Sequence, residues 1–119
     1  MEAKIRKATE DFLLRCGCSP ALSGFEPMRI AIELGVKEPH RLRRVCKDLY
    51  PEVASRMQSD CHATTQYMYK ALQNLLNESD LERMSKVLVI APKLNKECYT
   101  LKEFISTAAM FVRREVESS

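Results

Sequence analysis

Apolar positions recur along this chain at the three- and four-residue spacing of amphipathic helices. The first such stripe comprises Ile5, Ala8, Phe12, Leu13 and Cys16. Gly17 follows it directly, and a glycine there commonly ends a helix because it adopts left-handed backbone angles without strain. A second helix is predicted to begin between Gly24 and Pro27 and to end near Gly35. Its buried residues are expected to be Met28, Ile32 and Leu34.

Two prolines in the middle of the chain stand where helices can start. Pro39 allows a third helix to begin there, because the first turn of a helix needs no proline N–H. The buried stripe expected for this helix is Leu42, Val45, Cys46 and Leu49. Pro51 either kinks the same helix or opens a new short one, with Val53, Ala54 and Met57 on its buried side.

A further helix is predicted after residue 60. Ser59 or Asp60 can cap it, because a short side-chain oxygen accepts a backbone N–H that the first turn leaves unpaired. Its expected buried face is Cys61, Thr64, Met68, Leu72 and Leu75. The short helix, the polar turn and this longer helix together form a candidate helix-turn-helix, which indicates duplex DNA as a partner.

The last part of the chain predicts one clear helix and one ambiguous segment. Leu81, Met84 and Leu88 indicate a helix, whereas residues 87–99 fit a helix end and a loop better than a strand. Thr100 and Glu103 have the spacing of a capping box, so a final helix should start there. Its expected apolar face is Leu101, Phe104, Ile105, Ala108, Phe111 and Val112. The fold class expected from these patterns is all-α.

Composition supports one small helical domain covering residues 1–119. The 119 residues are 45% hydrophobic and include three glycines and no tryptophan. No apolar run approaches the roughly 18 residues of a membrane span. The first ten residues lack the apolar core of a signal peptide. We therefore expect a cytoplasmic protein with no membrane partner.

The cysteines and histidines do not predict a metal site or an enzyme. Five cysteines, an odd number, indicate reduced thiols in a protein without a signal peptide. The spacing of Cys16, Cys18, His40, Cys46, Cys61 and His62 matches no zinc pattern, so packing as small hydrophobic side chains is the favoured interpretation. Gly-rich phosphate loops, His-Glu-x-x-His and nucleophile motifs are absent. We expect no cofactor and no catalysis.

Basic residues gather just before the candidate helix-turn-helix. Lys37, Arg41, Arg43, Arg44 and Lys47 fall within eleven residues, in a chain of net charge +3. Arg43, Arg44 and Lys47, with Lys70 on the longer helix, are the expected contacts to DNA phosphates. A solvated helix face with no partner is the alternative interpretation.

Several residues together resemble the C-terminal DNA-binding effector domain of the sporulation-initiation response regulator of endospore-forming bacteria. They are Gly17, Gly24, Phe25, Met28, Arg29, Ala31, Ile32, Lys47, Leu49, Tyr50, Pro51, Ala54, Ala71, Leu72, Thr100, Glu103, Phe104 and Ile105. The resemblance covers nearly the whole chain and implies about six helices built around a helix-turn-helix. It also implies binding to DNA as a paired domain, a possible homodimer, and contact with an RNA polymerase sigma factor. In that family a phosphoacceptor receiver domain comes first, and this chain contains none.

The helix expected to read DNA departs from the family. The family carries arginines and a glutamate at positions that here are Ala63, Thr65, Gln66 and Tyr69. The residues expected to reach base edges are His62, Thr65, Gln66 and Tyr69. Gln66 could pair with adenine, Thr65 could touch a thymine methyl and Tyr69 could bond a phosphate. An altered sequence preference is predicted. The alternative is a relative that has lost specific DNA binding and modulates a full-length regulator through protein contacts.

Overall fold

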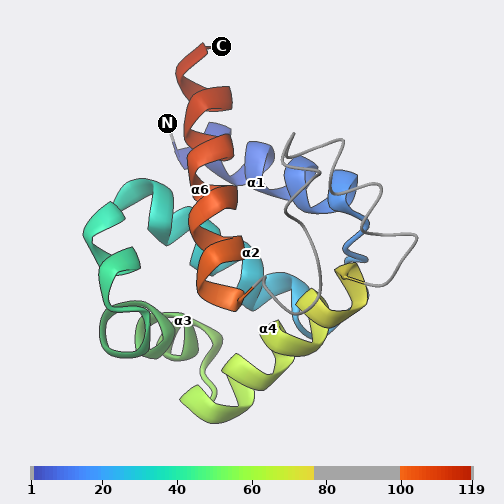
Figure 1. The fold of residues 1–119 in the computed structure, drawn as a ribbon, viewed down its shortest axis with the longest axis vertical. Helices are drawn as coiled ribbons and strands as arrows, with labels where there is room; N and C mark the ends of the chain where they lie inside the picture. Colours follow the sequence, from blue (N-terminus) through green and yellow to red (C-terminus); the bar gives the residue numbers. More distant parts are fainter. Residues whose placement is uncertain (1, 77–99, 119) are drawn as a thin grey trace.

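The computed structural model describes residues 2–76 and 100–118, and these residues contain helices and no strands (Figure 1). The elements are α1 (Glu2–Cys16), α2 (Phe25–Lys37), a 3-10 turn η1 (Pro39–Arg43), a π-helical turn η2 (Val45–Leu49), α3 (Tyr50–Met57), α4 (Cys61–Leu75) and α6 (Leu101–Ser118). The all-α prediction is confirmed. The expected helix containing Leu81, Met84 and Leu88, the segment 87–99 and Cys98 lie outside the described residues.

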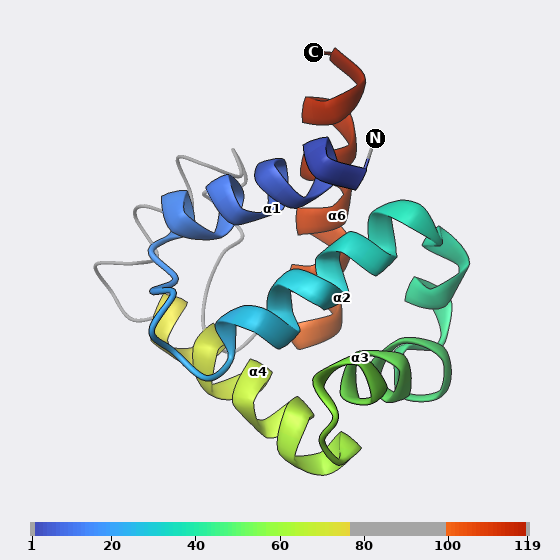
Figure 2. The ribbon, with the colours of Figure 1, turned by 180° about the vertical axis from the view of Figure 1, so that it is seen from behind.

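The central element is α2, which packs against α1, α3, α4 and α6. Figure 2 shows α2 crossing the middle of the molecule, with α1 and the end of α6 on one side and α3 and α4 on the other. Side chains buried at the centre include Leu13, Met28, Ile32, Leu49, Met68, Leu75, Phe104 and Ile105. This arrangement leaves α4 at one end of the fold.

The predicted end of α1 is confirmed, and that of α2 is wrong by two residues. Gly17 has a φ of 96°, and the N–H of Cys18 bonds to the carbonyl of Leu13 at 2.9 Å, which closes α1. Gly35 instead remains inside α2, which runs to Lys37. A Cβ at Gly35 would lie 3.2 Å from the Cβ of Ala109 in α6. Close packing of α2 on α6 therefore explains this glycine, rather than a helix end.

The single helix predicted from Pro39 is not present. The chain forms η1, breaks at Arg44 with φ −136° and ψ 66°, and re-forms as η2. Pro51 stands in the first turn of α3, so it opens a new helix, as one of the two predicted alternatives stated. The break changes which residues face inward, because side chains no longer follow one helical repeat.

The turn between α3 and α4 has the expected polar chemistry. Gln58 ends α3 in the left-handed region (φ 55°), and the N–H of Ser59 bonds to the carbonyl of Ala54 at 3.0 Å. Asp60 is the cap of α4, where its Oδ1 accepts the N–H of Ala63 at 2.9 Å. The structure thus selects Asp60 over Ser59.

The capping box of α6 is confirmed. The Thr100 hydroxyl accepts the N–H of Glu103 at 3.1 Å and donates to its carboxylate at 3.0 Å. The predicted apolar face of α6 is buried, except that Phe111 is half-buried. Arg113 further ties α6 to α2 by donating from Nη2 to the carbonyl of Val36 at 3.0 Å.

The prediction that the cysteines pack as small hydrophobic side chains is confirmed for Cys16 and Cys18 and is wrong for Cys46 and Cys61. Cys16 and Cys18 are buried, and burial raises the pKa of their thiols to about 12 and about 11. Cys46 and Cys61 are exposed. Cys46 turns outward because η2 does not continue the repeat of η1, and Cys61 is the first residue of α4, beyond the packed part of that helix.

Candidate nucleic-acid interface

The helix α4 has two chemically distinct faces. Thr64, Met68, Ala71, Leu72 and Leu75 are buried against the core. The opposite face presents uncharged polar side chains over the first two turns, and one cation, Lys70, beyond them. A helix with a packed face and an open polar face, preceded by a short helix and a tight turn, has the form of a recognition helix.

All four residues predicted to contact bases lie on the accessible part of α4. His62 and Gln66 are exposed, Tyr69 is 42% exposed and Thr65 is half-buried. The hydroxyl of Thr65 donates to the carbonyl of Cys61 at 2.7 Å, an interaction that the spacing of residues does not predict. The structure therefore brings this set together on one helix, with one hydroxyl already engaged.

A close backbone contact positions α4. A Cβ built on Gly24, just before α2, would lie 2.2 Å from the carbonyl oxygen of Tyr67 and 2.7 Å from the Cβ of Ala71. A glycine is thus needed where the start of α2 meets the middle of α4. The helical pattern placed Gly24 near a helix start but did not indicate this contact, since nothing local in the sequence points to a partner 43 residues away.

The residues predicted to contact phosphates are accessible. Arg43, Arg44 and Lys47 of η1–η2 are exposed, as is Lys70 of α4. Lys70 lines a shallow groove of about 220 Å³ with Ser23, Gly24 and Tyr67. Cations are therefore available both on η1–η2 and along α4.

Tyr50 is the first residue of α3 and is buried. Burial mainly raises the pKa of its hydroxyl, and the nearby Tyr69 and Cys46 raise it further. The helix α3 packs against both α4 and η2. The basic segment (residues 39–49) is therefore connected to α4 through α3.

Arg41 has a structural place within the basic segment. Its Nε bonds to the carboxylate of Glu38 at 3.1 Å, and its Nη1 donates to the carbonyl of Asp48. Glu52 of α3 lies 4.0 Å from the same guanidinium. Arg41 thus joins η1 to η2 and α3, whereas Arg43 and Arg44 make no ion pair within the described residues.

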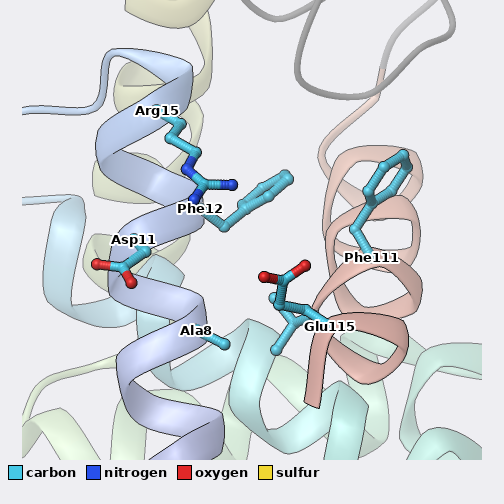
Figure 3. Close-up of a pocket in the computed structure, with 7 residues that line it drawn as sticks. Ala8, Asp11, Phe12, Arg15, Phe111 and Glu115 are labelled. Carbon is cyan, nitrogen blue, oxygen red and sulfur yellow. The ribbon is translucent and has the colours of Figure 1, made fainter. Parts of the chain in front are cut away.

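A second hollow lies between α1 and α6, not beside α4. Figure 3 shows Phe12 and Arg15 of α1 and Glu115 of α6 extending into the space between the two helices. The hollow measures about 200 Å³, and its lining contains no histidine, serine or thiol. Phe12 packs against Phe111 and Phe104 at ring-centroid distances of 6.4 and 6.2 Å. Packing between terminal helices accounts for this region, and it gathers no catalytic arrangement.

Comparison with known proteins identifies the family. Searches of curated proteins and of solved structures found no significant match. The protein-family description "Sporulation initiation factor Spo0A C terminal" matches residues 9–112. These residues include α2, the basic segment, the helix-turn-helix and most of α6. None of the described helices is both long and apolar enough to span a lipid bilayer. The chain therefore belongs to the Spo0A C-terminal family, the DNA-binding domain of a sporulation regulator.

Proposed function

We propose that this domain binds duplex DNA by placing α4 in the major groove, with a sequence preference that differs from that of its family. The observation that carries the proposal is the open face of α4, which carries the exposed Lys70 and is positioned by the Gly24 contact. A recognition helix contacts base edges with its first turns, where His62, Thr65 and Gln66 lie.

The phosphate contacts are assigned to exposed side chains that have no structural partner. Arg43 and Arg44 fit this description within the described residues, whereas Arg41 holds the fold together. Each phosphate neutralised by a cation releases counterions, so affinity should fall steeply with salt. Lys47 and Lys70 extend the same role along η2 and α4.

The test measures binding to a randomised duplex pool by fluorescence anisotropy at about 50 and 200 mM salt. Arg43→Ala/Arg44→Ala should weaken binding to all sequences and reduce the slope of log affinity against log salt by about 2, since each contact contributes about 0.9. Arg6→Ala/Arg114→Ala is the matched control, because it removes two exposed cations from α1 and α6 instead. An unchanged slope in the first variant, or equal losses in both, would contradict the proposed docking.

A second candidate function is protein interaction without DNA. It is favoured by the neutral first two turns of α4 and by the exposure of Tyr67 (41%) and Tyr69 (42%). Tyrosine is enriched at protein interfaces because it combines a large apolar ring with a polar tip. A stable dimer that retains no DNA at the lower salt would favour this function. A monomer that binds duplexes would exclude it.

A further inference from the structure

From the hydrogen-bonding capacity of the α4 surface, we propose that this domain selects A·T base pairs, with Gln66 binding adenine and the Thr65 methyl contacting thymine. This inference rests on the proposed DNA-binding function and specifies its target. It concerns the first two turns of α4, where recognition helices make their base contacts.

The first two turns of α4 lack the side chains that most often read guanine. Guanine is most often read by an arginine or lysine that donates two hydrogen bonds to O6 and N7. On α4 the first cation is Lys70, more than two turns from the helix start at Cys61. The cap carboxylate of Asp60 adds negative charge at that end. The end of α4 that would enter the groove therefore provides no strong guanine donor.

Thr64 and Thr65 are neighbours on α4 with different roles. The Thr64 hydroxyl is buried and donates to the carbonyl of Asp60 at 2.9 Å, so this residue belongs to the core. The Thr65 hydroxyl donates to the carbonyl of Cys61 at 2.7 Å. A hydroxyl has a single proton, so Thr65 cannot also donate to a base. Its partly exposed side chain retains a methyl group, which suits the C5-methyl of thymine.

Gln66 is exposed and has no hydrogen-bond partner in the described part of the chain. Its amide offers a donor and an acceptor side by side, the pair that matches N7 and N6 of adenine. His62 does not oppose this preference, because its ring can donate to N7 of either purine. Two side chains in the first two turns of α4 discriminate between base pairs, Thr65 and Gln66, and both favour A·T.

The experiment begins with selection of bound duplexes from a random pool by the wild-type domain. The expected motif contains A·T steps, and changing the adenine contacted by Gln66 to guanine should weaken binding by about 5- to 150-fold. Gln66→Arg should shift the preference at that position toward guanine. Gln73→Arg adds the same charge to an exposed site in the last turn of α4, so it should strengthen binding without changing the motif.

The thymine contact is tested by replacing thymine with deoxyuridine, which removes only the methyl group. Wild-type affinity should fall about four-fold, the value of one buried methylene-sized group. The loss should persist in Thr65→Val and disappear in Thr65→Ser, which keeps the hydroxyl bonded to Cys61 but lacks the methyl.

The outcomes distinguish failure of the A·T assignment from failure of DNA binding. Salt-dependent binding to a guanine-centred motif that is unchanged in Gln66→Ala would overturn the A·T assignment and leave DNA binding intact. An equal deoxyuridine penalty in Thr65→Ser and wild type would overturn the thymine contact. Absence of binding to any duplex would overturn the inference together with the proposed function.

Discussion

Replacing Gly24 by alanine is expected to displace α4 from the core. The added Cβ would lie 2.2 Å from the carbonyl oxygen of Tyr67 and 2.7 Å from the Cβ of Ala71. Both atoms belong to the main body of α4, so no flexible side chain can move aside. The start of α2 and the middle of α4 must therefore separate by about 1 Å, which disturbs packing on both helices.

The size of the effect follows from two opposing contributions. Overpacking of this kind costs about 1–3 kcal/mol. The backbone at Gly24 (φ −83°, ψ −7°) is compatible with alanine, so the restricted unfolded chain returns about 0.4–1 kcal/mol. We expect a net loss of about 1–2 kcal/mol in the free energy of unfolding. Because α4 also moves relative to the basic segment, affinity for DNA should fall as well.

The assay is urea unfolding followed by far-UV circular dichroism, since the chain has no tryptophan. Gly35→Ala is the matched control. Its Cβ would lie 3.1 Å from Cδ2 of Leu42 and 3.2 Å from the Cβ of Ala109, and the half-buried Leu42 side chain can shift. Alanine also gains about 1 kcal/mol over glycine within a helix. Gly35→Ala should therefore stay within about 1 kcal/mol of wild type. Equal stability and equal DNA affinity in the two variants would refute the reasoning.

Two further predictions concern stability. The hydrogen bonds from Arg29 lower the pKa of Glu26 below its ordinary value of 4.5. Their contribution to the free energy of unfolding is therefore present above pH 4.5 and is lost as the pH falls through the lowered pKa. Glu26→Gln should lower the free energy of unfolding at pH 7 by less than about 1 kcal/mol, since the side chain is 52% exposed. Urea titrations should show this difference narrowing below pH 4.5, and a constant difference would contradict it. Asp60→Ala should lower the free energy of unfolding by about 1 kcal/mol through loss of the α4 cap. Asp60→Asn keeps a hydrogen-bond acceptor and should lose little stability in the same assay. Similar losses in both variants would exclude the cap as the cause.

Local chemistry made much of the fold predictable. Thr100 with Glu103, Gly17 and Asp60 each act within a few residues, so their spacing alone places the helix ends. Gly35 was misread because its role depends on Ala109 in α6. The break at Arg44 was missed because the bond from Arg41 to the carbonyl of Asp48 supports an irregular backbone that periodicity cannot describe.

For the candidate site, the sequence predicted which side chains of α4 are accessible but not which groups are already hydrogen-bonded. Periodicity placed His62, Gln66 and Tyr69 on the accessible face of α4, because that helix is regular. Periodicity did not reveal that Arg41 serves the fold while Arg43 and Arg44 remain accessible. It also did not reveal the proton already committed by Thr65. Such distinctions depend on hydrogen-bond partners, which spacing along the chain does not specify.

The separation of the two faces of α4 has a consequence for how this protein can evolve. Thr64, Met68 and Leu72 hold the helix in place, while Gln66 and Lys70 make no contribution to that packing. Exposed substitutions usually change stability by less than about 0.5 kcal/mol. Mutations on the outer face can therefore accumulate with little folding penalty, and under the proposed docking lineages can acquire new operators one residue at a time on an unchanged scaffold.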